Sequence, residues 1–322
     1  MRMAANGLEP RLGGGVAAVV RRLCGVQAQD AAAARLAIRA RSEGLVAGDV
    51  DAEPDVVRTW GWRGTLHLLA REDVPWVLSL VAERENRAVA SRWRALELDD
   101  GVYARARATI TERLAAGPAT RAELREALAA AGVDASGQRL PHLVRRAAFE
   151  GLLHHPLDGT FAALEPLGDP PPREEAVARL VRRHAEGYGP ATPDDVAAFA
   201  GVPKADVRAA WVDDGARAAD DGASGRVRLL GAFDPFLLGY RGYGHVVAEE
   251  HVRKVWPGGG WIRPVVLVDG VAAGTWRLDG ARLVVDAFGA IPGEGLEAEA
   301  QDVARFLGRE LAVSVAGPAG AG

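Results

Sequence analysis

A four-residue motif that occurs twice constrains the fold of this chain more than any other feature. Gly-Pro-Ala-Thr stands at residues 117–120 and again at 189–192, each time after an apolar helical stretch. Glu123 completes a capping-box pattern with Thr120, and Pro193 takes the first helical position after Thr192. The repeat predicts two copies of one helix–cap–helix motif.

The residues after each copy have the order of a helix-turn-helix. In the later copy we expect a helix over 194–200, a turn at 201–203 and a second helix over 204–212. In the earlier copy the turn falls at 132–137 and the second helix at 139–150. The segment 152–162 then predicts a strand, a turn and a strand, which is the wing of a winged helix.

The N-terminal stretch allows the same interpretation less clearly. Apolar spacing predicts helices over 16–23 and 31–41, and the segment 56–69 reads as a helix end followed by a strand over 64–69. A long amphipathic helix over 74–98 would bridge to the next unit.

The pattern becomes β-like after Trp211. Strands are predicted at 227–230, 261–268, 272–278 and 282–286, with Asp-Gly hairpin signals between them, and a closing helix follows at 298–311. The expected fold class is α+β, with tandem winged-helix (helix-turn-helix) units and a C-terminal β-barrel-like domain. The expected divisions are 1–100, 101–168, 173–228 and 229–315, with a disordered tail at 316–322.

Composition limits the class of protein. The 322 residues carry a net charge of −4, one cysteine and 48% hydrophobic residues, which excludes wholesale disorder, a disulfide framework and a cysteine-rich zinc site. No apolar run could span a bilayer, and the N-terminus lacks an apolar signal core. We therefore expect no membrane partner and a cytoplasmic, nucleoid-associated location. A chain of net negative charge can still bind nucleic acid if one face is basic.

Most enzyme signatures are missing from the sequence: there is no phosphate loop, dinucleotide fingerprint, nucleophile elbow or HExxH. His154 and His155 lack an evident third ligand, so no metal site is expected. Four side chains share the outer face of the helix predicted at 139–150, namely Arg139, His142, Arg145 and Arg146. This face either contacts DNA phosphates or is only solvated.

The segment Gly25 to Asp30 carries a pair of glutamines between two predicted helices. If it is extended, Gln27 and Gln29 project to the same side and offer two amide groups to one small target. The other interpretation is helix capping or simple loop polarity. Downstream, the stretch 58–68 is dense in arginine and tryptophan.

Several of these segments together resemble the winged-helix DNA glycosylase family that includes AlkZ. The resemblance covers nearly the whole chain. It is carried by the following stretches: 23–29, which matches the family's Gln-x-Gln motif, 62–68, 229–240, 257–262, 267–270 and 274–276. One departure is Arg241-Gly242-Tyr243, where the family often has an Arg-Asp-Arg run. That difference bears on substrate range.

The resemblance implies catalysis by Gln27 and Gln29 on double-stranded DNA that carries bulky or crosslinking alkyl lesions. The implied substrate is an N7-alkylguanine, which already bears positive charge, so that its glycosidic bond breaks without a strong general acid. Gln29 would position a water and Gln27 would orient its partner or the deoxyribose, with Asp30 as an alternative base. Arg63 and His67 would lie near the lesion unless they are structural members of a strand. No cofactor or metal is implied, and a monomer is expected.

Two other classes of function remain open from the residues alone. A non-catalytic DNA-binding regulator would share every feature except a use for the glutamine pair. A protein- or ligand-interaction module would use the apolar faces of its winged helices, and its binding would not depend on salt.

Overall fold

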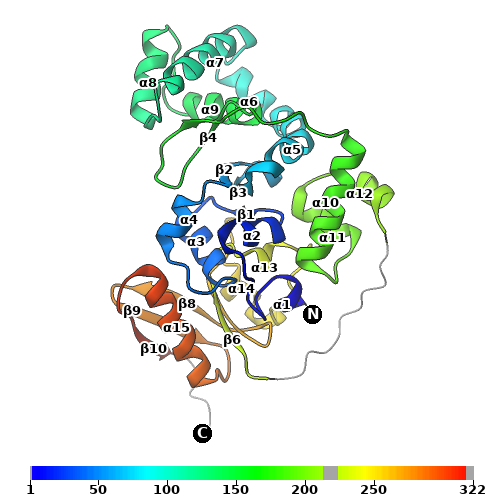
Figure 1. Cartoon of the computed structure of the whole chain (residues 1–322), viewed down its shortest axis with the longest axis vertical. Coiled ribbons are helices and arrows are strands. Elements are labelled where there is room, and N and C mark those ends of the chain that lie inside the picture. Colours follow the sequence, from blue (N-terminus) through cyan, green and yellow to red (C-terminus); the bar gives the residue numbers. More distant parts are fainter. Residues whose placement is uncertain (1, 213–223, 317–322) are drawn as a thin grey trace.

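The computed structural model describes residues 2–212 and 224–316. Both helices and strands occur in this part of the chain, so the mixed α and β composition expected from the sequence is found. In Figure 1 a small central sheet lies between an upper lobe of helices and a lower, five-stranded sheet. None of the helices described has both the length and the apolarity that crossing a lipid bilayer requires.

The N-terminal region surrounds a three-stranded antiparallel sheet whose strand order is β1-β3-β2. Its elements are α1 (Arg2–Ala5), α2 (Gly15–Arg22), β1 (Val26–Gln27), α3 (Ala31–Arg39), α4 (Ala47–Ala52), β2 (Val56–Trp60), the 3₁₀ turn η1 (Trp62–Gly64), β3 (Leu66–Ala70) and the 3₁₀ turn η2 (Arg71–Asp73). The expectation of a helix end after residue 56 is wrong. Val56, Val57 and Thr59 are β-branched, and the segment pairs with β3 along its whole length.

The predicted bridging helix over 74–98 is two helices, α5 (Val74–Ala88) and α6 (Ala90–Ala95). The break is at Val89, whose φ and ψ of −101° and 4° leave the helical region. It turns Trp93 and Leu96 toward the hydrophobic core of the following unit. The chain here follows this tertiary packing and not the continuous helix that the local pattern predicts.

Both copies of the repeated motif do precede capped helices, as predicted. The earlier copy leads from α7 (Asp100–Ala115) into α8 (Arg121–Ala130), and Thr120 and Glu123 form the capping box. The later copy leads from α10 (Arg173–Tyr188) into α11 (Pro193–Ala200), with Thr192 and Asp195 in the same roles.

The two copies then diverge. The earlier one continues through α9 (Arg139–Phe149) to the short strand pair β4 (Leu153–His154) and β5 (Ala162–Ala163). The later one continues to α12 (Lys204–Ala210), and the next described strand belongs to the C-terminal sheet. The helix-turn-helix order is therefore present twice, and the winged-helix class of each unit stays a prediction.

The C-terminal sheet is open, so the predicted β-barrel is wrong. Its strand order is β10-β9-β8-β7-β6, and β6 and β10 are its two edges. Its region contains β6 (Val227–Leu230), α13 (Pro235–Leu238), the 3₁₀ turn η3 (Glu249–His251), α14 (Val252–Val255), β7 (Val265–Val268), β8 (Val271–Asp279), β9 (Arg282–Ala287), α15 (Gly293–Leu307) and β10 (Ala312–Ala316). Helix α15 packs against β6, where Val227 leaves no room for a side chain at Gly295.

Several predicted bounds in this region differ from those of the observed elements. The division at residue 228 falls inside β6, which pairs with β7 from Val227 to Leu230. The strand expected from residue 261 begins at Val265, and the closing helix spans 293–307 and not 298–311. Ala316 of the predicted tail ends β10, which pairs in parallel with β9; residues 317–322 lie outside the described residues.

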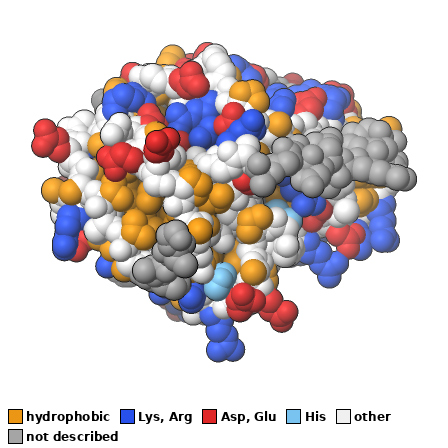
Figure 2. Space-filling model, turned by 90° about the horizontal axis from the view of Figure 1, so that it is seen from below, with side chains coloured by type: hydrophobic (Ala, Val, Ile, Leu, Met, Phe, Trp, Pro, Cys, Tyr) orange, Lys and Arg blue, Asp and Glu red, His pale blue; other side chains and the backbone are white. Residues whose placement is uncertain are grey.

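Buried arginines join the N-terminal region to the C-terminal sheet. Arg41 donates to both carboxylate oxygens of Asp234, at 2.9 and 2.7 Å, and both side chains are fully buried. Arg39 likewise reaches Glu299 at 3.1 Å and Asp302 at 2.8 Å on α15. Viewed from the end that carries this sheet, acidic, basic and apolar side chains are interspersed, with no uniformly basic surface on that face (Figure 2).

We expect Arg41→Met to lower the free energy of unfolding by about 3–5 kcal/mol, because it leaves a buried carboxylate without its counter-charge. The matched control is Arg277→Met, since Arg277 pairs with Asp286 and both side chains are more than half exposed. The control should cost no more than about 1 kcal/mol. Urea denaturation measures both, and equal losses would show that the buried pair does not fasten the two regions.

Candidate active site

The glutamine segment begins at a turn that is stabilised by a hydrogen bond from a tryptophan distant in the sequence. Cys24 and Gly25 both have positive φ, 55° and 103°, where α2 ends and β1 begins. The fully buried Trp62 donates from Nε1 to the Cys24 carbonyl at 2.7 Å. A side chain at Gly25 would lie 2.7 Å from Leu69 Cδ2, so only glycine fits this close approach.

After this turn, both glutamines lie beside strand β3. Gln27 is the antiparallel partner of His67, and Ala28 N–H donates to the Leu66 carbonyl at 2.7 Å. Gln29 Oε1 accepts from Leu66 N–H at 3.3 Å. Gln27 is half-buried and Gln29 is exposed. The structure thus brings the two amides to one strand and leaves the second accessible from solvent.

A row of polar side chains crosses the three strands. His67 of β3 is the register partner of Gln27 on one side and of Thr59 on the other. Directly opposed residues project to the same face of a sheet, so these three side chains are neighbours. Gln27 Oε1 and Thr59 Oγ1 are both buried without a hydrogen-bond partner among the described residues. Such atoms need a polar partner, which makes this face a candidate binding surface.

Burial keeps His67 neutral. Burial lowers the pKa of His67 to about 4, and the nearby Arg63 charge adds to this, while the Thr65 carbonyl acts in the opposite sense. His67 Nδ1 lies 3.0 Å from that carbonyl, which can only accept, so Nδ1 carries the proton. The lone pair is then on Nε2. The row Gln27–His67–Thr59 therefore carries no charge at neutral pH.

Arginines gather beside this row at the turn between β2 and β3. Arg63 has a φ of 53° and donates from Nη1 to the Ala198 carbonyl of α11 at 3.3 Å. Its Cγ and Arg84 Nη1 lie 3.1 and 3.2 Å from the position of a side chain at Gly201. Arg145 of α9 pairs with Glu85 at 2.7 Å, next to Gly64. Helices α5, α9 and α11 thus all contribute atoms to the surroundings of the turn.

The predicted outer face of α9 makes contacts within the chain. Arg139 donates to the Asp134 carbonyl at 2.8 Å and also to the Leu96 carbonyl. His142 Nδ1 accepts from Trp93 Nε1 at 3.2 Å. Burial lowers the pKa of His142, and the charges of Arg145 and Arg92 lower it further.

Arg146 belongs to the same packed face. It pairs with Asp100 at 3.1 Å and lies over the rings of Trp93 and Tyr103. The side chains of Arg139, Arg145 and Arg146 are only 15–21% exposed, so the face is packed and is not freely solvated. Its contact with phosphates stays a prediction.

Two other sequence candidates have structural roles. Asp30 caps α3, its side chain accepting from Ala33 N–H at 3.0 Å. The His155 ring lies between Trp60 and Phe161, with Nδ1 2.6 Å from the Thr160 carbonyl. Within the described ranges no group of three or more histidine, cysteine or acidic side chains could hold a metal ion.

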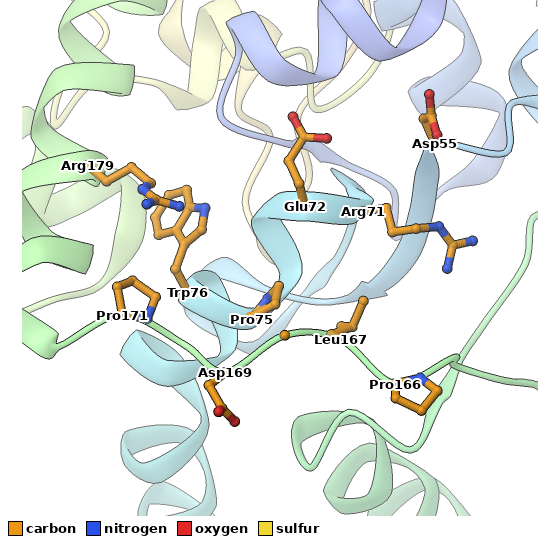
Figure 3. A pocket seen from close by; sticks show the side chains of 11 residues that line it. Asp55, Arg71, Glu72, Pro75, Trp76, Pro166, Leu167, Asp169, Pro171 and Arg179 are labelled. Atoms are coloured by element: carbon orange, nitrogen blue, oxygen red, sulfur yellow. The ribbon is translucent and has the colours of Figure 1, made fainter.

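A separate cavity of about 570 Å³ lies at the other end of the β2–β3 hairpin (Figure 3). The residues lining it include Asp55, Arg71, Trp76 and Arg179, with the stretch 166–169 along one side. None of the predicted site residues lines this cavity. It is therefore distinct from the glutamine-bearing face.

Comparison with known proteins decides the family. The sequence model of a family described as "DNA glycosylase AlkZ-like" matches residues 20–306, most of the chain. The chain belongs to the AlkZ-like DNA glycosylase family. The enzyme class expected from the sequence is thereby confirmed, because DNA glycosylases hydrolyse N-glycosidic bonds.

A sequence comparison and a structure comparison agree with this assignment. A protein of Streptomyces sahachiroi named "Interstrand DNA cross-link repair glycosylase" is 32% identical, in an alignment that covers 95% of each chain. The solved structure of Streptomyces sahachiroi DNA glycosylase AlkZ superposes with a TM-score of 0.82 at 29% identity, covering 98% of this chain and 97% of that one. The family fold thus extends through nearly the whole molecule.

Sequence reasoning missed two residues of this region, Arg58 and Thr59. Both lie on β2, where the sequence pattern predicts a helix end, and the sequence analysis therefore does not bring either residue beside β3. Val57 and Thr59 are β-branched and Trp60 is aromatic, a composition typical of strands that could have found them.

Acid should destabilise the fold through its buried histidines. Burial lowers the pKa of His67, His184 and His245 from 6.5 to about 4 in each case. Between pH 6.5 and 4 the unfolded chain therefore binds more protons than the folded one. The free energy of unfolding should fall as the pH is lowered through this window, by up to about 1.4 kcal/mol per pH unit for each histidine.

Urea titrations between pH 8 and 5 measure this dependence. Above pH 6.5 these histidines should contribute no slope, and His184→Gln should make the slope below 6.5 shallower. An unchanged slope in that variant would contradict the assignment.

Proposed function

We propose that this chain is a monofunctional DNA glycosylase that releases cationic alkylated purines such as N7-alkylguanine and unhooks interstrand crosslinks. The observation that carries the proposal is the pair Gln27 and Gln29, placed beside the neutral row of β3 and β2 and next to an arginine-rich turn. The naming of the Streptomyces relative as a cross-link repair glycosylase supports the same substrate class.

The chemistry of such a substrate suits uncharged catalytic groups. An N7-alkylguanine carries a positive charge, so the electrons of the C1′–N9 bond neutralise it when the base leaves. The sugar then becomes oxocarbenium-like, as in glycoside hydrolysis. Oxygen dipoles aimed at C1′ stabilise this charge, and no strong general acid is needed.

Gln29, Gln27 and His67 each have a role in this scheme. Exposed Gln29 holds the attacking water, and the half-buried Gln27 directs its oxygen toward the sugar or the water. The water oxygen bonds to C1′ and its proton passes to solvent. Neutral His67 lies beside the lesion without repelling its charge, whereas a protonated imidazole would. Asp30 is occupied by its helix cap and takes no part.

The bond-cleaving step is hydrolysis alone. A glycosylase with lyase activity attacks the sugar with an amine. The sequence holds two lysines: Lys204 pairs with Asp194, and Lys254 lies over the Phe288 ring. Neither contacts the glutamine row, which supports a monofunctional reaction.

The exposure of Gln29 fits a bulky lesion. A base joined to the opposite strand cannot be turned out into a closed pocket, as most glycosylases require. A surface site needs only a grip on the backbone. We propose that Arg63 lies near the lesion, against the adjacent phosphate, and that Arg139, His142, Arg145 and Arg146 contact other phosphates. Contact by these four requires some of their hydrogen bonds and ion pairs within the chain to be broken.

Gln27→Ala and Gln29→Ala should each lower excision of N7-methylguanine by about 10²–10³-fold, since each removes a group that acts on the transition state. Release is measured as alkali-labile abasic sites in duplex DNA. Gln301→Ala is the matched control, because its amide contacts only Glu297 on α15. Unchanged excision by the double variant, with duplex binding retained, would favour a non-catalytic DNA-binding protein.

Arg63→Ala should weaken duplex binding and reduce the slope of log affinity against log salt by about 1, because one phosphate contact is lost. Arg277→Ala, an exposed arginine of the C-terminal sheet, should leave the slope unchanged. Fluorescence anisotropy over a range of salt concentrations gives both slopes. Equal slopes for wild type and Arg63→Ala would remove Arg63 from the interface.

A further inference from the structure

Arg58 is a buried arginine whose hydrogen bonds all go to backbone carbonyls. It lies in the middle of β2, and the residue is 8% exposed. It donates from Nε to Ala28 O at 2.9 Å and from Nη1 to His155 O and Pro156 O, both at 3.1 Å. No carboxylate of the described residues lies within ion-pair distance of it.

A buried charge without a counter-ion is costly, and burial accordingly lowers the pKa of Arg58. An apolar side chain would fill the same place in β2 at less cost. Since the guanidinium adds no ion pair, its contribution must come from the three carbonyls that it holds together. One of these is the carbonyl of Ala28, the residue between Gln27 and Gln29.

We infer that Arg58 is a positioning residue. It fixes the position of Gln29 relative to Gln27, and it links this position to the β4–β5 loop. The inference rests on the proposed function of the glutamine pair.

The need for such a residue follows from where β1 ends. The strand stops at Gln27, and the last backbone bond to β3 is that from Ala28 N–H to Leu66 O. Beyond this bond the ladder no longer orients the chain. Arg58 donates a hydrogen bond to the Ala28 carbonyl. Both the N–H and the carbonyl of Ala28 are therefore held by hydrogen bonds. The direction in which Gln29 leaves the strand is thereby set.

The same guanidinium binds the loop between β4 and β5. The loop contacts both the side chain and the backbone of Arg58, because His155 N–H also donates to the Arg58 carbonyl at 2.8 Å. The His155 ring between Trp60 and Phe161 keeps the loop against β2. This loop is the turn of the wing predicted from the sequence at 152–162, and it belongs to the same unit as the arginine-bearing helix α9. A shift of the loop on a duplex would therefore act on the Ala28 carbonyl through one side chain.

Arg58→Met tests the inference, because methionine keeps the aliphatic packing and removes every donor. It should lower kcat for N7-methylguanine release by about 10²-fold, the effect of misplacing a reacting group by 1 Å. KM and duplex affinity should stay within about threefold of wild type. Arg58→Lys should restore part of kcat, since one amine can reach one carbonyl.

The matched control is Arg71→Met at the other end of the same hairpin. Arg71 also donates only to a backbone carbonyl, Pro54 O, at 3.2 Å. Its removal should change kcat less than about twofold. If Arg58→Met and Arg71→Met have equal effects on kcat, Arg58 only stabilises the hairpin and the inference is wrong.

A spectroscopic measurement keeps the inference falsifiable if Arg58→Met does not fold. The chain has four glutamines, Gln27, Gln29, Gln138 and Gln301, so ¹⁵N-glutamine labelling gives four side-chain ¹⁵N signals, one for each amide nitrogen. In Arg58→Lys the signals of Gln27 and Gln29 should shift, while those of Gln138 and Gln301 stay in place. Four unmoved signals would overturn the inference.

The glutamine variants separate this result from a failure of the proposed function. If Gln27→Ala and Gln29→Ala keep full excision, the glutamine mechanism itself fails. If they lose excision while Arg58→Met keeps its kcat, the mechanism stands and the positioning role of Arg58 is wrong.

Discussion

The antiparallel pairing of β1 with β3 is the contact on which the proposed chemistry depends. It is short: Val26 and Gln27 pair with Leu68 and His67, and one further bond joins Ala28 to Leu66. So small a ladder would fray if it stood alone. Trp62 holds the turn before it, and Arg58 holds the peptide after it. Distant parts of the chain thus fix the geometry of one exposed segment.

A second constraint is the way in which the N-terminal region is fastened to the C-terminal sheet. Arg39 and Arg41, on and just after α3, make buried ion pairs with Glu299 and Asp234, from segments far along the chain. Asp30 caps the same helix, directly after the glutamines. The planar guanidinium suits such bidentate, desolvated pairs better than a lysine amine does. Arg39 and Arg41 therefore stabilise the fold from its interior.

Local signals in the sequence predicted local structure well. Thr120 with Glu123, and Thr192 followed by Pro193, identified the starts of α8 and α11, because a cap depends on residues within one turn. The strand β6 was also predicted at its correct bounds. Long-range effects could not be read in this way. The break at Val89 serves packing against another unit. The strand β2 is a different case: its partner β3 follows it in the same hairpin, and its β-branched residues favour the strand that the sequence analysis does not predict. The sheet is open because β6 and β10 do not pair, and pairing between strands so far apart in the chain has no local signal.

The site shows the same division. Gln27 and Gln29 were found from a motif and a resemblance, and the structure brings both to β3. The roles of Thr59 and Arg58 rest on contacts between strands and between units, which no spacing along the sequence reveals. His67 was expected near the lesion, but its neutrality depends on burial in the folded state.

A structure of the chain on a duplex that contains a cationic aza-sugar would test the central claim most directly. The ring nitrogen of that analogue stands in for the developing charge at C1′. Our account predicts that the Gln27 and Gln29 amides contact it, directly or through one water, with the β4–β5 loop on the adjacent backbone. An aza-sugar bound elsewhere, with both amides out of hydrogen-bond reach, would contradict the account.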